Sequence, residues 1–211
     1  MTSTNPNAKI QKQNSFIQQS IVGIWGLGLA TIVFIWISTS IGSLTGELHD
    51  SIGAVARLFG LLATYAALTQ LLLMGRIWWI ERPFGLDVLA RFHRVNGYAV
   101  LIGMLLHINL IILHQSLESG QNFITQYINT VTTYPDVWKA AIGAVLLILV
   151  VVSSIYIARK HLKFESWYFV HIFAYLAIIL AAGHQFEIGP TIASTPFATI
   201  FWYSLYGFVA L

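Results

Sequence analysis

The sequence predicts an all-α membrane protein, a bundle of six transmembrane helices with its N-terminus in the cytoplasm. Three observations lead to this prediction. Of the 211 residues, 57% are hydrophobic and 9% are charged, whereas a soluble domain carries about 25% charged residues. Six apolar stretches approach or reach the roughly 20 residues that a helix needs to cross a bilayer. Finally, lysine and arginine gather on one side of these stretches.

The six stretches are separated by short polar connections. They cover residues 16–38, 54–74, 95–114, 137–157, 167–183 (with an end as late as 188) and 196–211. All five prolines lie between the stretches or at their ends, as expected of helices. Helices are also expected because every backbone polar group within lipid must be paired. We therefore predict a tail over residues 1–15 and one six-helix domain over residues 16–211.

The positions of the basic residues predict the orientation. The tail, the second connection and the fourth connection carry nine of the eleven lysines and arginines. These nine are Lys9, Lys12, Arg76, Arg82, Arg91, Arg94, Arg159, Lys160 and Lys163. Basic residues favour the cytoplasmic side, so the first, third and fifth helices run outward and parallel. We expect a multi-pass protein of the plasma or inner membrane, surrounded by lipid, with no nucleic-acid partner.

Two apolar stretches begin and end with histidine. In "HRVNGYAVLIGMLLH" the histidines are His93 and His107, and in "HIFAYLAIILAAGH" they are His171 and His184. At 1.5 Å per residue the two spacings correspond to about 21 Å and about 19.5 Å. Because the two helices are expected to run parallel, the histidines can form an inner pair and an outer pair at matched depths. Ionisable residues inside a membrane are costly, and they indicate function.

The paired histidines predict two metal centres stacked along the membrane normal. The chain has no cysteine, which excludes thiolate-held clusters and the attachment motif of c-type haem. Neutral imidazole is a good ligand for haem iron, and two imidazoles fill both axial positions. Tetrahedral zinc is the weaker alternative because each level offers two histidines, no cysteine and no nearby acid. Stacked haems would divide one long electron transfer into shorter steps.

Helical geometry is in conflict with part of this prediction. A spacing of 14 brings His107 to within about 40° of the azimuth of His93. A spacing of 13 leaves His184 about 140° away from His171. Either the fifth helix is irregular, with Gly183 as the candidate position, or the two centres lie at different azimuths around it.

The stretches "FHRVNGYAVLIGMLLH" and "HIFAYLAIILAAGHQ" resemble the ferric reductase-like transmembrane domain of NADPH oxidases and metalloreductases. This resemblance implies a six-helix bundle with two b-type haems, the inner one held by His93 and His171 and the outer one by His107 and His184. It also implies that FAD and NAD(P)H bind to a cytoplasmic flavin domain, either downstream in a longer chain or on a partner. Electrons would pass to a small acceptor outside, an Fe(III) chelate or oxygen. The sixth helix should end in the cytoplasm without a basic anchor, so we expect a longer chain.

The resemblance also suggests roles for other residues. Arg57 matches an arginine near the outer haem of the oxidases, where it could pair with a propionate or attract an anionic acceptor; the alternative is an interface anchor. The oxidases carry a further histidine four positions after the outer ligand, and here that position is Ile111, which puts oxygen in doubt as the acceptor. His114 could close the outer chamber or mark the membrane surface. Arg91 and Arg94 could hold inner-haem propionates or act as cytoplasmic anchors.

Two other functions remain open at this stage. One is a quinol-linked cytochrome b or the haem-binding membrane subunit of a periplasmic reductase, because such cytochromes use similar histidine spacings. The other is a transporter or channel whose histidines relay protons, which would not explain the matched depths. His49 and His161 are expected in connections, and we assign them no role.

Overall fold

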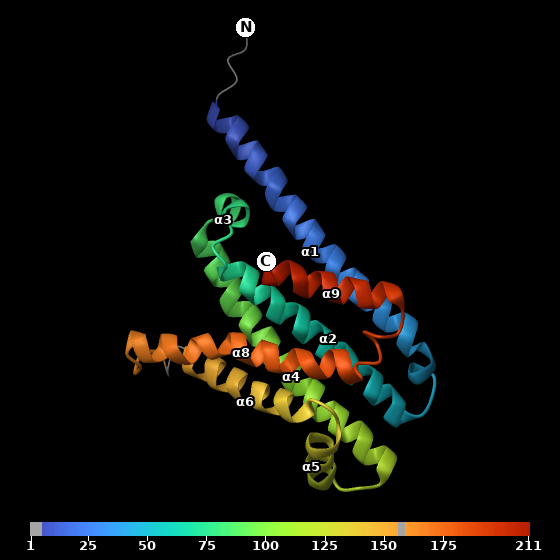
Figure 1. The fold of residues 1–211 in the computed structure, drawn as a ribbon. Coiled ribbons are helices and arrows are strands. Elements are labelled where there is room, and N and C mark those ends of the chain that lie inside the picture. The colour runs from blue at the N-terminus through green and yellow to red at the C-terminus, as the bar shows by residue number, and fades with distance from the viewer. Residues whose placement is uncertain (1–5, 156–158) are drawn as a thin grey trace.

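The computed structural model describes residues 6–155 and 159–211, and every regular element in this part of the chain is an α-helix. The helices pack side by side with short connections (Figure 1). Their bounds are α1 Pro6–Leu44, α2 Leu48–Met74, α3 Trp78–Phe84, α4 Leu86–Ser119, α5 Phe123–Thr133, α6 Val137–Ser154, α8 Phe164–Ile188 and α9 Pro196–Ala210. The prediction of an all-helical membrane protein is confirmed.

Among the described residues, five helices are long and apolar enough to cross a membrane. They are Gln11–Leu44 within α1, together with α2, α4, α6 and α8. The sixth predicted span corresponds to α9, which has 15 residues and therefore a length of about 22 Å at 1.5 Å per residue. This is short of the roughly 30 Å of a bilayer's hydrocarbon core, so a sixth crossing stays a prediction.

Helices α1 and α4 begin earlier than predicted. Helix α1 begins at Pro6, so most of the predicted tail belongs to the same helix as the first span. Residues 1–5 of that tail lie outside the described residues, as does the predicted end of the fourth stretch at residue 157. Helix α4 begins nine residues before the predicted start at 95 because Gly85, at φ +80°, separates it from α3.

Two short helices occupy connections in which no helix was predicted. Helix α3 follows α2 and contains Pro83, and Gln18 of α1 donates a hydrogen bond of 2.5 Å to the carbonyl oxygen of Pro83. Helix α5 is capped at its N-terminus by Asn122, whose side chain accepts a hydrogen bond from the backbone N–H of Thr125. The two lie at opposite ends of the bundle (Figure 1). The α3 end also holds the N-terminal end of α1 (Figure 1), so the basic residues of the tail and of the second connection lie at the same end, and the orientation in the membrane stays a prediction.

Two close helix pairs form the centre of the bundle. Helix α2 packs along α4, and α6 packs along α8. Each pair approaches closely at a glycine, because a Cβ at Gly103 would lie 3.1 Å from the Cβ of Ala63 and one at Gly143 would lie 2.8 Å from the carbonyl oxygen of Ala177. Small residues allow such contacts between membrane helices.

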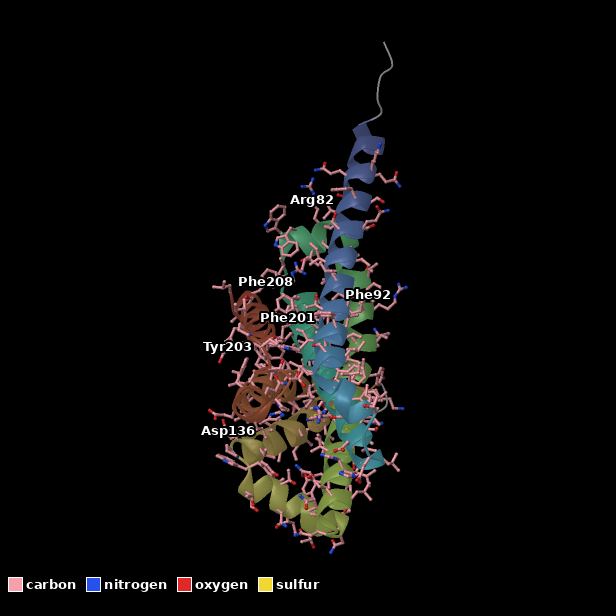
Figure 2. The ribbon with its side chains drawn as sticks, turned by 90° about the vertical axis from the view of Figure 1, so that its right-hand side faces the viewer. Arg82, Phe92, Asp136, Phe201, Tyr203 and Phe208 are labelled. Atoms are coloured by element: carbon pink, nitrogen blue, oxygen red, sulfur yellow. The ribbon has the colours of Figure 1, made fainter. Side chains whose placement is uncertain are left out.

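Helix α9 closes one side of the bundle. Its Trp202 is fully buried against Ile32 of α1 and Leu61 of α2. The outer surface is strongly apolar, and Phe16, Ile24 and Leu27 of α1 are each about two-thirds exposed or more. Figure 2 shows side chains projecting outward along the part of α1 for which they are drawn. Such a surface suits lipid rather than water as its surroundings.

Candidate functional site

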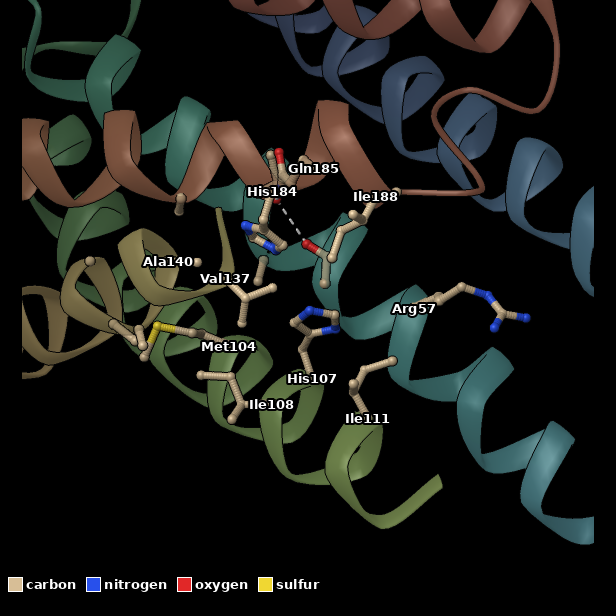
Figure 3. Close-up of a pocket in the computed structure, with 18 of the residues that line it drawn as sticks. Arg57, Met104, His107, Ile108, Ile111, Val137, Ala140, His184, Gln185 and Ile188 are labelled. Atoms are coloured by element: carbon tan, nitrogen blue, oxygen red, sulfur yellow. Dashed lines mark hydrogen bonds between the residues drawn. The ribbon is translucent and has the colours of Figure 1, made fainter. Parts of the chain in front are cut away.

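The predicted outer histidines lie opposite each other. His107 of α4 and His184 of α8 have ring centroids 6.3 Å apart and face the same space (Figure 3). The Nδ1 atom of His107 lies 2.9 Å from the carbonyl oxygen of Ala56. In the tautomer that donates this bond, Nε2 of His107 has a free lone pair for a metal ion.

The predicted inner histidines form a second pair. The ring centroids of His93 on α4 and His171 on α8 lie 6.0 Å apart. Their Nδ1 atoms have oxygen partners, the carbonyl of Gln70 at 3.4 Å from His93 and the hydroxyl of Ser154 at 3.2 Å from His171. Both pairs predicted from sequence are therefore brought together, and three of the four Nδ1 atoms have an oxygen partner.

The spacing of both pairs suits a single metal ion between two imidazoles. With a metal–nitrogen bond of about 2.0–2.1 Å and about 1.1 Å from ring nitrogen to ring centre, two imidazoles on opposite sides of one metal ion have centroids about 6.2–6.4 Å apart. The observed separations are 6.0 Å and 6.3 Å. Within residues 6–155 and 159–211, no group of three or more His, Asp or Glu side chains could hold a metal ion. Each level therefore offers two imidazoles as its protein ligands.

The structure leaves room for a cofactor beside the outer pair. A cavity of about 460 Å³ includes both rings in its lining, and this volume is within the range of about 300–1,000 Å³ found for ligand pockets. Met104, Ile108 and Val137 contribute apolar side chains to its wall (Figure 3). An apolar wall suits the face of a porphyrin, and the two histidines supply axial nitrogens, so the residues present fit a haem.

Glycine 60 makes the position of His107 possible. A Cβ at Gly60 would lie 2.7 Å from Nδ1 of His107 and 2.9 Å from Cε1. Side chains do not approach so closely, so the ring occupies space that only glycine leaves open. Gly60 and Ala56 are one turn apart on α2, and together they fix the ring from one side.

The conflict over azimuth is resolved in favour of different azimuths. Helix α8 is continuous from Phe164 to Ile188 and passes through Gly183 without a break, so the predicted irregularity is absent. Helix α8 runs obliquely to α4 (Figures 1 and 2). Where two helices cross obliquely, the side of α8 that faces α4 changes along the length of α8. Histidines on different sides of α8 can therefore both reach α4.

Arg57 and His114, the other residues predicted for the outer half, line the cavity but form contacts with other residues. Arg57 lies 3.4 Å from the hydroxyl of Ser43, and its side chain extends away from the imidazole rings (Figure 3). Nδ1 of His114 donates a hydrogen bond of 2.8 Å to the carbonyl oxygen of His49, and the two rings stack at 5.8 Å. Both Arg57 and His114 belong to the lining, and neither is brought into contact with the outer pair.

The structure places Arg91 and Arg94 in exposed positions on either side of His93. The described contacts bring neither guanidinium to the inner histidines. Their predicted role toward haem propionates therefore stays a prediction.

Sequence reasoning missed the polar residues around the inner pair. Asn96 donates hydrogen bonds to the carbonyl oxygen of Ala66 at 2.7 Å and to the side-chain oxygen of Gln70 at 2.8 Å, and Gln70 donates to the backbone of His93 at 2.9 Å. The available signal was Gln70, the lone side-chain amide of the apolar helix α2, together with Asn96 three residues after His93 on α4. These bonds attach the first half of α4 to α2.

An aromatic stack beside His171 was also missed. The ring of Trp167 lies 4.9 Å from that of His171, and its Nε1 donates to the hydroxyl of Ser154 at 3.2 Å. Arg159 lies 4.7 Å above the Trp167 ring, within reach of a cation–π interaction. The spacing of four between Trp167 and His171 places both on one face of α8.

A third set of missed residues follows the outer pair. Gln185, the neighbour of His184, accepts a hydrogen bond of 2.5 Å from Tyr206 and donates to the hydroxyl of Thr64. These bonds join α8 to α9 and α2. No sequence pattern indicates these bonds, because they depend on how three separate helices meet.

Comparison with known proteins agrees with the site. The sequence model of the family described as ferric reductase like transmembrane component matches residues 59–182, more than half of the 211 residues. The match includes His93, His107 and His171, and His184 lies two residues beyond its end. No curated protein and no solved structure matches the chain.

Proposed function

This chain belongs to the ferric reductase-like transmembrane family, and from that premise we propose that it carries single electrons across a membrane through two b-type haems. Each haem is held between one histidine of α4 and one of α8. The electrons come from cytoplasmic NAD(P)H by way of FAD on a downstream or partner domain. They pass to an acceptor on the outer side. This acceptor is either an Fe(III) chelate or oxygen, and oxygen would give superoxide.

The observation that carries this proposal is the pairing of four histidines at two levels. The two ring-centroid separations, 6.0 Å and 6.3 Å, agree with the spacing that one iron between two imidazoles requires. When bound, haem supplies an iron that changes between the ferric and ferrous states by one electron. The spacing of 14 residues on α4 separates the two levels by about 21 Å.

The chain's own residues orient the ligands and keep water out. The carbonyl oxygens of Ala56 and Gln70 lie at Nδ1 of His107 and His93. A partner at Nδ1 fixes the tautomer and turns Nε2 toward the metal. The apolar wall of the cavity, including Met104 and Ile108, lowers the access of water to the outer level. Two axial histidines leave no open coordination position, so the acceptor would take its electron at the haem edge.

The direction of transfer follows from the basic residues. The α3 end of the bundle carries most of the lysines and arginines and is assigned to the cytoplasm. The inner pair then lies nearer to the flavin, and the cavity with Arg57 and His114 opens toward the acceptor. A cation at this position would attract an anionic acceptor.

Haem content tests the proposal. We expect two haems per wild-type chain, a Soret band that shifts on reduction with dithionite, and one haem per chain after His107→Ala, with the inner haem retained. His93→Ala should also lower the stoichiometry. His161→Ala is the matched control, because His161 is exposed, and it should keep both haems.

Two outcomes would contradict the proposal. A colourless wild-type protein would favour a transporter or channel, and retention of two haems in both ligand variants would mean that other residues bind iron. Reduction by a quinol but not by the flavin domain would instead assign the chain to the quinol-linked cytochromes b.

A further inference from the structure

Asp136 occupies an unusual position at the start of α6. It has φ +59°, a left-handed conformation that non-glycine residues adopt rarely. One carboxylate oxygen, Oδ1, forms an ion pair of 2.6 Å with Lys139, one turn further along α6. The side chain of Asp136 is 25% exposed, so most of it is buried. Backbone strain of this kind is a reason to look for a function.

The second oxygen of the same carboxylate is directed at α8. A Cβ built at Gly183 would overlap Oδ2 of Asp136 and would lie 3.2 Å from its Cγ. Gly183 therefore leaves the space into which this carboxylate packs. The next residue of α8 is His184, the outer ligand. Val137 and Ala140, from the first turn of α6, lie beside the His184 ring (Figure 3).

His184 differs from the other three histidines at its Nδ1 atom. The Nδ1 atoms of the other three have oxygen partners at 2.9 to 3.4 Å. Nδ1 of His184 is buried and has no hydrogen-bond partner in the described part of the chain. Leaving a buried N–H group unpaired is unfavourable, because the group has lost its hydrogen bonds to water. Metal-bound histidines nearly always donate this hydrogen to a carboxylate, a carbonyl or water.

We propose that Asp136 is the positioning residue of the outer haem, accepting the Nδ1 hydrogen of His184 when iron is bound at Nε2. The proposal rests on the proposed function, since it needs a haem between His107 and His184. Oδ1 stays with Lys139 while Oδ2 turns toward His184, and the carboxylate thereby bridges α6 and α8.

This arrangement makes the two axial ligands of the outer haem unequal. His107 has a neutral carbonyl as its partner, whereas His184 would have a carboxylate. A carboxylate partner raises the basicity of an imidazole ligand and so stabilises ferric over ferrous iron. Lys139 offsets part of the negative charge. Asp136 would therefore lower the reduction potential of the outer haem and leave that of the inner haem unchanged.

Potentiometric titration of the purified protein, with both haems resolved optically and by electron paramagnetic resonance, tests this role. Asp136→Asn should raise the reduction potential of the outer haem. The equilibrium constant for its reduction should increase at least tenfold, which corresponds to about 59 mV for one electron. Gly183→Ala should shift the potential in the same direction without changing any charge, because its Cβ displaces Oδ2. Lys139→Gln should shift it in the opposite direction. Gly207→Ala is the matched control, since nothing lies within 4 Å of a Cβ there.

The outcomes separate this inference from the proposed function. Two haems per chain with an unchanged outer potential in Asp136→Asn and in Gly183→Ala would overturn the inference and leave the function intact. If Asp136→Asn does not fold, Gly183→Ala and Lys139→Gln test the inference, because their outer-haem potentials should shift in opposite directions. Equal outer-haem potentials in these two variants overturn the inference. A wild-type protein without haem would overturn both proposals.

Discussion

Replacing Gly60 by alanine should weaken the outer haem site and spare the inner one. The added Cβ would lie 2.7 Å from Nδ1 of His107, whereas ordinary contacts begin at 3.4 Å. The ring would have to move by about 0.7 Å, well beyond the ±0.2 Å within which metal–ligand distances are held. It cannot move freely, because the same nitrogen is hydrogen-bonded to Ala56 on the same helix.

The expected magnitude follows from the cost of overpacking. An extra methyl group in a well-packed site costs about 1–3 kcal/mol. If this cost falls on the haem-bound state, haem affinity at the outer site decreases roughly 5- to 150-fold. The helix itself gains slightly from alanine, so the fold should not suffer.

The measurement is haem per chain, followed by a haem titration of the depleted protein. Gly53→Ala is a close control, because a Cβ at Gly53 would lie 2.9 Å from the ring of His114, a histidine that is not expected to bind iron. Gly60→Ala should lose up to one haem per chain, and Gly53→Ala should keep two. Equal haem content in the two variants would refute the reasoning.

Two further predictions concern hydrogen bonds around the site. Asn96→Leu removes two part-buried hydrogen bonds, to Ala66 and to Gln70. At about 0.5–1.5 kcal/mol for each bond, we expect a loss of about 1–3 kcal/mol and a lower midpoint of thermal unfolding, with the inner haem lost first. An unchanged midpoint would contradict this. Tyr206→Phe removes only the bond to Gln185 and should cost about 1 kcal/mol, visible as a small decrease in the same midpoint with both haems retained. Loss of the outer haem in Tyr206→Phe would show that this bond also positions His184.

The helices and the histidine pairs could be predicted because each depends on a local pattern. Apolar length predicts membrane spans, and the spacing of His93 and His107 on one helix matches that of His171 and His184 on another. The matched depths then required only that both helices run in the same direction. The family match over residues 59–182 agrees with this interpretation.

The geometry of α8 could not be predicted because it depends on how two helices cross. The conflict between spacings of 14 and 13 assumed that α4 stays on one side of α8, and an oblique crossing removes that assumption. Gly183 was the candidate position for an irregularity, but α8 is unbroken there, and the glycine instead leaves space for Asp136. A contact between residues so far apart in sequence leaves no local pattern.

The two short helices α3 and α5 could not be predicted either. Helix α3 contains Pro83. A proline is tolerated in the first turn of a helix, but further along it usually argues against a helix. Pro83 is the sixth residue of this seven-residue helix, and its carbonyl oxygen is held by Gln18 of α1. A tertiary contact of this kind overrides the local preference.

The most direct measurement is the haem content of the purified wild-type chain together with the coordination state of its iron. Two haems per chain, both low-spin and with two histidine ligands each, are the expected result. One haem or none, or a high-spin iron with an open axial position, would contradict the assignment of the four histidines as two ligand pairs.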